Sequence, residues 1–125
     1  MTKVFRDVQV FMAAAGQTVG EENIPQSSLY HNLIVEEYNE YIAARNAKDD
    51  KEIIDACFDT IWVIVGYMHS RGWDCDKIWD EGALSNLTKI DKNTGKVIKR
   101  EDGKVLKPEG WKPPDFSKFV NQAKM

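Results

Sequence analysis

The sequence predicts an all-α protein, an antiparallel bundle of about four helices with a small C-terminal β-hairpin. Apolar residues recur at helical spacing in four segments before residue 88, and only residues 96–106 have a strand-like pattern. The break between the second and third helical segments is short, which makes these helices antiparallel neighbours. A chain of 125 residues suits one domain, 1–125.

The first two helices are predicted on either side of a polar loop. Residues 3–15 place their apolar side chains on one helix face, and Gly16 ends that helix. Residues 16–27 are rich in loop-forming residues. Ser27 or Ser28 is expected to cap the second helix, which should run from about Leu29 to Ala47.

The third and fourth helices follow after short breaks. Asp49 or Asp50 is a natural N-cap for a helix that reaches about Ser70, and a fourth helix is expected over residues 74–87. The second half of the third helix, TIWVIVGYM, is apolar nearly all round. Such a helix is buried on most sides, in a core or at a subunit interface, so we expect the helices to oligomerise through their faces.

The C-terminal part of the chain changes character. The segment GKVIKREDGKVLK indicates two short strands around Asp102-Gly103, a dipeptide that favours a tight hairpin turn. Val97 and Val105 are expected on the inward face of this hairpin, at about residues 96–106. The last 19 residues, 107–125, should wrap the surface.

Composition and charge exclude several classes of protein. With 42% hydrophobic and 30% charged residues, the chain is neither a disordered tail nor a disulfide scaffold. The net charge of −3 argues against a nucleic-acid binder. The longest apolar run is too short for a membrane, and charged residues come early at the N-terminus, so a soluble, cytoplasmic protein is expected. Cys57 is expected to fill the core, and Cys75, between two aspartates, to be unreactive.

Charge is distributed unevenly along the chain. Residues 36–59 contain eight acidic and three basic residues, whereas residues 89–125 contain ten basic and five acidic residues. On the second helix Glu36, Glu37 and Glu40 share one side. On the third helix the same holds for a second set of acids, namely Glu52, Asp55 and Asp59.

Two acidic clusters on antiparallel neighbours would face each other. Carboxylates that close repel one another, and a hard divalent cation such as Mg²⁺ relieves the repulsion. The alternative is a solvated acidic face with no ligand. Because acids recur at matching positions on two neighbouring helices, a metal site is favoured over a solvated acidic face.

The residues around these acids resemble a known family. The segments LIVEEYNEYIAA, EIIDACFDTIWVIVGYMHSRGWD and EGALSNLTK are similar to the all-α nucleoside triphosphate pyrophosphohydrolases, which include the MazG-like proteins and phosphoribosyl-ATP pyrophosphohydrolase. The resemblance covers about residues 4–116. Its motifs are Glu36-Glu37-x-x-Glu40, Glu52-x-x-Asp55 and Ser85-Asn86-x-x-Lys89.

This resemblance implies a reaction and a cofactor. The expected reaction is Mg²⁺-dependent hydrolysis of a (deoxy)nucleoside triphosphate between its α and β phosphates, giving the monophosphate and pyrophosphate, with Mn²⁺ as a substitute ion. Family members are usually dimers or tetramers, so a homodimer or homotetramer is expected. Neither nucleic acid nor membrane is expected as a partner. The assumed task is control of the nucleotide pool.

Roles are assigned to individual residues on that basis. The metal ligands are Glu37, Glu40, Asp55 and Asp59, although helical phase leaves open whether Glu52 or Asp59 completes the set with Asp55. Glu36 or Glu52 is expected to orient or deprotonate the water molecule that attacks the phosphate. Lys89 is the favoured phosphate contact. Further substrate contacts are expected from Asn86, Gln17, Lys96, Lys99 and Arg100.

Two rival functions stay open. Phosphoribosyl-ATP is an alternative substrate, although the basic tail and the lack of a linked cyclohydrolase domain favour a free-standing nucleotide-pool enzyme. A non-catalytic helical interaction module is the other alternative, with the acids as a solvated face and TIWVIVGYM as a partner interface.

Overall fold

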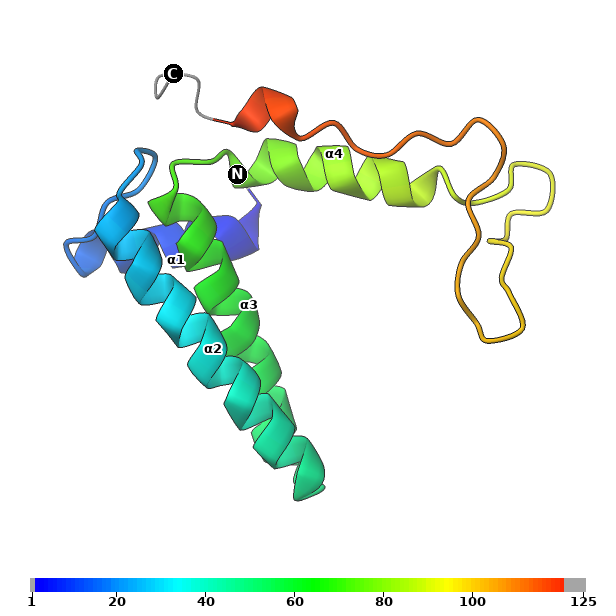
Figure 1. Ribbon diagram of the computed structural model, residues 1–125. Helices are drawn as coiled ribbons and strands as arrows, with labels where there is room; N and C mark the ends of the chain where they lie inside the picture. Colours follow the sequence, from blue (N-terminus) through cyan, green and yellow to red (C-terminus); the bar gives the residue numbers. More distant parts are fainter. Residues whose placement is uncertain (1, 121–125) are drawn as a thin grey trace. The chain divides into compact units, whose positions relative to one another are not determined.

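The computed structural model describes residues 2–120 (Figure 1). These residues form the helices α1 (Lys3–Ala14), α2 (Ile24–Asn46), α3 (Asp50–Ser70) and α4 (Cys75–Leu87), followed by the 3₁₀ helix η1 (Ser117–Phe119). The all-α class and the four principal helices are therefore confirmed. The described chain divides into two compact units, residues 2–76 and residues 77–120. A single domain over 1–125 stays a prediction.

In the first unit, α2 and α3 pack against each other as an antiparallel pair, and α1 packs against α3 (Figure 1). Each helix contributes apolar side chains to one core. The core residues are Phe5, Val8 and Met12 from α1, Tyr30 from α2, Val63 and Val65 from α3, and Cys75. This packing fixes the faces that α2 and α3 turn toward each other.

The predicted start of α2 is wrong by five residues. The helix begins at Ile24, because the side chain of Asn23 accepts a hydrogen bond from the Gln26 backbone N–H. Pro25 stands in the first turn, where its missing N–H costs nothing. Ser27 lies inside the helix and donates its hydroxyl to the Ile24 carbonyl. The loop before α2 is therefore shorter than expected.

The bounds of α3 agree with the prediction. Asp49 is its N-cap and accepts a hydrogen bond from the Glu52 backbone N–H at 3.3 Å. The helix ends at Ser70 with Arg71 as its C-cap, and Gly72 follows with a φ of +74°, a conformation that favours glycine. The cap and the stop signal are thus both confirmed.

The apolar half of α3 is covered on most of its sides. Val63, Val65 and Gly66 are buried, whereas Ile61 and Ile64 are 56% and 43% exposed. The prediction that this half is buried on most sides is therefore confirmed within one copy of the chain, and Ile61 and Ile64 mark its exposed side. Cys57 is also exposed, which corrects its predicted place in the core. The reason is its position on α3, away from the side that meets α2.

Cys75 is buried beside His69, with its Sγ 3.7 Å from the ring Nδ1. Burial, and then the charges of Asp76 and Asp74, raise the pKa of the Cys75 thiol to about 11. The thiolate is therefore disfavoured, as the two flanking aspartates predict, although burial is the larger cause.

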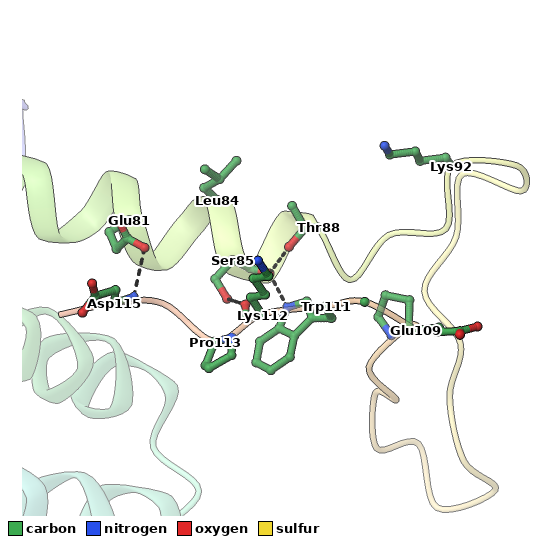
Figure 2. Close-up of a pocket in the computed structure, with 12 residues that line it drawn as sticks. Glu81, Leu84, Ser85, Thr88, Lys92, Glu109, Trp111, Lys112, Pro113 and Asp115 are labelled. Carbon is green, nitrogen blue, oxygen red and sulfur yellow. Dashed lines mark hydrogen bonds between the residues drawn. The ribbon is translucent and has the colours of Figure 1, made fainter. Parts of the chain in front are cut away.

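In the second unit an extended segment lies along α4 (Figure 2). The indole N–H of Trp111 donates to the Ser85 carbonyl at 2.8 Å, and the Ser85 hydroxyl donates to the Lys112 carbonyl at 3.1 Å. The Asp115 backbone N–H donates to the Glu81 carboxylate at 3.0 Å. A cavity of about 560 Å³ lies between the two segments.

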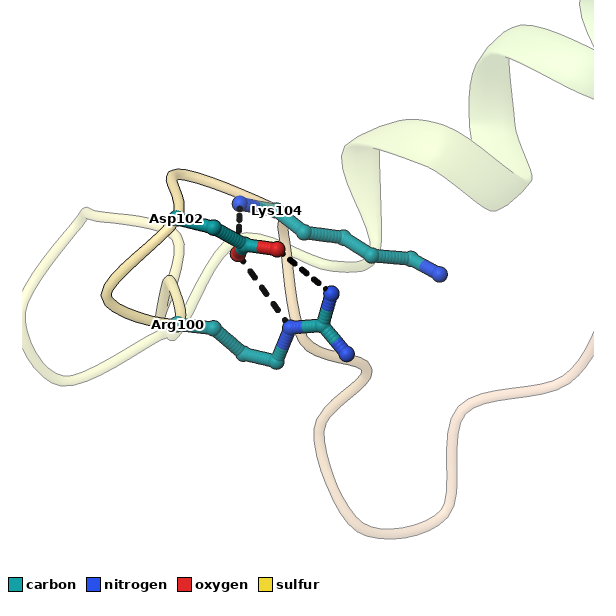
Figure 3. A network of polar contacts seen from close by, with 3 residues as sticks. All are labelled: Arg100, Asp102 and Lys104. Carbon is teal, nitrogen blue, oxygen red and sulfur yellow. Dashed lines mark hydrogen bonds and ion pairs between the residues drawn. The ribbon is translucent and has the colours of Figure 1, made fainter.

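The predicted C-terminal hairpin is wrong as a pair of strands. Within residues 96–106 the structure has a turn and an isolated antiparallel bridge between Lys99 and Val105, but no strand. Arg100, Asp102 and Lys104 hold the turn by polar contacts (Figure 3). Val105 stays 39% exposed, so the segment lacks the apolar cover that a two-stranded ribbon needs.

None of the helices in residues 2–120 combines the length and apolar character needed to cross a membrane.

Candidate functional site

The predicted acids of α2 differ in their burial. Glu37 is half-buried, because it lies on the side of α2 that meets α3. Glu36 and Glu40 are exposed at the edge of that side. The helix therefore presents one partly desolvated carboxyl group with two more beside it.

The acids of α3 show the same gradation. Asp59 is half-buried, and both Asp55 and Glu52 are exposed. The backbone N–H of Glu52 is part of the N-terminal cap, so its carboxylate stands in the first turn of α3. The acids of this helix thus span from its first turn to its middle.

The electrostatics show that four of the predicted acids share one site. The pKa of Glu37 is raised to about 7, first by burial and then by the charges of Asp59, Glu40 and Asp55. A hydrogen bond in which the protonated Glu37 carboxyl donates to Glu40 adds to this rise. The pKa of Asp59 is raised by burial and by the charges of Asp55 and Glu40. The structure therefore brings Glu37, Glu40, Asp55 and Asp59 together.

This cluster lacks a compensating cation from the chain itself. Within residues 2–120, none of the four acids forms an ion pair with a lysine or arginine. One Glu37 carboxyl oxygen, Oε2, is buried and has no hydrogen-bond partner in the described structure. A buried carboxyl oxygen without a partner is costly, so the site favours a positively charged ligand.

A cavity of about 480 Å³ opens beside the cluster. Glu40, Glu52 and Asp55 line it, together with Asp49. The rest of its wall consists of small side chains, which leave room next to the carboxylates: Ala43, Ala44, Ala47 and Ala56. These alanines were not among the predicted site residues. The sequence pattern that could have indicated them is the presence of alanines about one helical turn from the acids on both helices.

The donor set fits a hard divalent cation by its chemistry. All of the candidate ligands are carboxylate oxygens, which Mg²⁺ and Mn²⁺ prefer. The unpartnered Glu37 oxygen and the mutual repulsion of the acids point the same way. In the described part of the chain, no three His, Cys, Asp or Glu side chains are already arranged as metal ligands.

The predicted phosphate-binding residues belong to the second unit. The Lys89 ammonium donates to the Asn86 side-chain oxygen at 3.0 Å and lies 5.2 Å from the centre of the Trp111 ring. Both contacts join Lys89 to neighbouring residues of the second unit. Lys96 and Lys99 are exposed, and Arg100 forms an ion pair with Asp102 at 2.7 Å.

Gln17 is engaged in the core of the first unit. Its side-chain oxygen accepts a hydrogen bond from the Tyr30 hydroxyl at 2.6 Å. Tyr30 was not singled out in the sequence. Its only signal there is its position seven residues before Glu37, on the same side of α2.

Comparison with known protein families gives one match. Residues 15–86 match the family described as phosphoribosyl-ATP pyrophosphohydrolase. The matched range contains α2, α3 and nearly all of α4, and thus all six predicted acids. No curated protein matches the chain.

Proposed function

The chain belongs to the phosphoribosyl-ATP pyrophosphohydrolase family, within the MazG-like all-α superfamily, and we propose that it cleaves (deoxy)nucleoside triphosphates to monophosphate and pyrophosphate. The family consists of hydrolases that act on acid anhydrides, so the prediction of an enzyme is confirmed over that of a non-catalytic module. The proposed cellular task is control of the nucleotide pool.

One observation carries the proposal. Four carboxylates from α2 and α3 meet without a lysine or arginine partner in residues 2–120, and burial, followed by the charges of the other three acids, raises the pKa of Glu37 to about 7. A protein gains nothing in stability from such a cluster. A magnesium-bound triphosphate, by contrast, needs an acidic site that attracts the metal and leaves room for phosphates.

We assign Glu37, Glu40, Asp55 and Asp59 as the residues that would hold Mg²⁺, or Mn²⁺ as a substitute. When bound, such an ion neutralises charge on the phosphate oxygens. Asp59 rather than Glu52 completes the proposed set with Asp55, because the charges of Asp55 and Asp59 both act on Glu37.

The remaining residues receive roles that follow from their positions. Glu52 lines the cavity with Glu40 and Asp55, so it is the favoured acceptor of the proton from the attacking water, with Glu36 as the second candidate. Lys89, held by Asn86, is the proposed contact for the terminal phosphates. Lys96, Lys99 and Arg100 are weaker phosphate contacts, and Gln17 remains a candidate contact for the base.

Phosphoribosyl-ATP is the second candidate substrate. The observation that favours it is the family match itself, whose description names this compound. Hydrolysis of either substrate breaks the anhydride between the α and β phosphates. The carboxylate site alone serves both reactions equally well.

The test is a substrate panel with product identification. The chain is incubated with ribo- and deoxynucleoside triphosphates and with phosphoribosyl-ATP, each with Mg²⁺, and released pyrophosphate and orthophosphate are measured separately. We expect pyrophosphate from at least one triphosphate. Turnover of phosphoribosyl-ATP alone would select the second candidate, and orthophosphate as the first product would contradict both.

A second copy of the chain completes the proposed assembly. Ile54, Phe58 and Ile61 on α3 are 69%, 57% and 56% exposed. An apolar face of this kind is a usual contact between subunits. It supports a homodimer or homotetramer formed through helix faces.

A further inference from the structure

We propose that Tyr30 and Gly66 lock the register of α2 against α3 and thereby position the carboxylate cluster. Both are positioning residues that touch neither metal nor substrate. The inference rests on the proposed function in one respect, the role of the four acids as metal ligands.

Tyr30 and Gly66 are in close contact across the two helices. A Cβ built on Gly66 would lie within 2.7 Å of the Tyr30 ring carbon Cζ, a separation that no real Cβ contact adopts. The Tyr30 ring is only 3% exposed. The ring therefore occupies the space that a side chain at position 66 would need, and only glycine leaves this space open.

The contact is tied to the carboxylates by helical geometry. Glu37 lies seven residues after Tyr30 on α2, and Asp59 lies seven residues before Gly66 on α3. Seven residues make about two turns and return to the same side of a helix. Because the helices are antiparallel, both steps lead in the same direction along the pair. Placing Tyr30 against Gly66 thus places Glu37 opposite Asp59.

Two linked hydrogen bonds, one of them between α2 and α3, form a polar chain that supports the same register, one turn further from the acids. The side-chain amide of Gln26 donates to the Ser70 hydroxyl at 2.8 Å, and that hydroxyl donates to the Gly66 carbonyl at 2.8 Å. Gln26 precedes Tyr30 by four residues, and Ser70 follows Gly66 by four. Ser70 is fully buried, so breaking this chain by a slip of the helices would leave buried polar groups unpaired.

The lock has a consequence for the ligands. A slip of one turn displaces facing residues by about 5.4 Å, more than the distance over which two carboxylates can share one cation. The hydroxyl of Tyr30 also donates to Gln17 at 2.6 Å, which fixes the ring at its far end. Tyr30 is held at both ends, and it sets the position of α2 relative to α3.

The experiment measures metal binding in the absence of nucleotide. Mn²⁺ is titrated by calorimetry into the full chain, into Gly66→Ala and into the double variant Tyr30→Leu/Gly66→Ala. We expect Gly66→Ala to weaken Mn²⁺ binding at least tenfold with helical content retained. The smaller Leu side chain makes room for the added methyl group but loses the hydrogen bond to Gln17, so the double variant should recover part of the affinity.

Gly82→Ala is the matched control, since it makes the same change inside α4, where the added Cβ meets only the Phe116 ring at 3.4 Å. It should bind Mn²⁺ like the wild type. Equal weakening in Gly82→Ala, wild-type affinity in Gly66→Ala, or no recovery in the double variant would overturn the inference.

Ser70→Ala keeps the inference testable if Gly66→Ala does not fold. This change adds no atoms and breaks the polar chain from Gln26 to Gly66. It should weaken Mn²⁺ binding about threefold, and unchanged binding would count against the lock. Pyrophosphate release by the wild type is measured separately, so a chain that binds Mn²⁺ but releases none would contradict the proposed function alone.

Discussion

Glu37 is the acid on which the four-carboxylate site depends at the scale of single residues. Its carboxyl group is half-buried, one of its oxygens has no partner, and three other acids act on it. Replacing it with Gln preserves its shape and removes its charge. We expect kcat/KM to fall at least a hundredfold, which corresponds to about 2.7 kcal/mol of transition-state stabilisation.

Folding should survive the Glu37→Gln change, because the variant relieves repulsion in the metal-free chain. The melting temperature in EDTA is expected to be equal to that of the wild type or higher. Glu21→Gln, at an exposed loop position, serves as the control and should keep full activity. Wild-type turnover in Glu37→Gln would remove this residue from the site.

The same residue predicts how stability depends on pH. The folded-state pKa of Glu37, about 7, lies above its ordinary value of 4.5, so the folded chain binds more protons than the unfolded chain between these values. Its contribution to stability is therefore present below about pH 4.5 and is lost as the pH rises through 7. Denaturant unfolding in EDTA should show this decline, and Glu37→Gln should reduce it. A flat profile in the wild type would contradict the desolvated position of Glu37.

Lys89 allows a test of the phosphate contacts. If it binds the terminal phosphates, Lys89→Ala should weaken triphosphate binding by about 1.5–3 kcal/mol, and monophosphate binding far less. Salt should reduce the difference. Titrations of nucleotide and of Mg²⁺ on both proteins provide the measurement. Metal binding without nucleotide should not change, because Lys89 is not a ligand, and equal losses for both nucleotides would assign the basic tail no part in binding.

At the scale of elements, α2 is capped by Asn23 and not by the predicted Ser27 or Ser28. Asn23 accepts from the Gln26 backbone N–H, whereas Ser28 is exposed within the helix. Asn23→Ala should cost about 1 kcal/mol of unfolding free energy, and Ser28→Ala should cost little. Chemical denaturation of both variants gives the comparison. A larger loss for Ser28→Ala would place the start of the helix where the sequence pattern alone places it.

The pair formed by α2 and α3 also explains why the site has its composition. The end of the pair near the turn between α2 and α3 carries acids and alanines, and the opposite end carries Tyr30, Gly66 and most of the core. The apolar end buries the larger side chains, whereas the acidic end buries only small ones such as Ala44 and Ala56. Because the same two helices form both ends, we expect packing at the first end to affect the geometry at the second.

At the scale of the whole molecule, charge and apolar exposure differ between the two units. Residues 2–76 contain 13 acidic and six basic residues, whereas residues 77–120 contain seven acidic and ten basic residues. The acidic unit also carries the exposed apolar face of α3. A second copy packed on that face would remove Ile54, Phe58 and Ile61 from water.

The oligomer is tested by sedimentation. The wild-type chain should sediment as a dimer or tetramer at micromolar concentration. Ile61→Glu places a charge on the exposed face, so it should shift the chain toward monomer while circular dichroism stays helical. A wild type that is monomeric at this concentration would contradict the proposed assembly.

Local sequence signals determined much of this protein. The Asp49 cap, the stop at Arg71-Gly72 and the apolar spacing were sufficient to place α1, α3 and α4, because they act over one or two turns. Helical phase alone also indicated that Glu36, Glu37 and Glu40 would share one side of the second helix, and Glu52, Asp55 and Asp59 one side of the third. It left open whether Glu52 or Asp59 joins Asp55 in the metal set. These features depend only on neighbours along the chain.

The tertiary structure decided what depends on distant neighbours. The pKa of Glu37 rises because α3 removes it from water, the exposure of Cys57 depends on which side of α3 meets α2, and residues 96–106 form no ribbon because nothing apolar covers them. The contact of Tyr30 with Gly66 is of the same kind. Periodicity shows that a helix has a buried face, but the partner's side chains determine which atoms meet there and how much water is left.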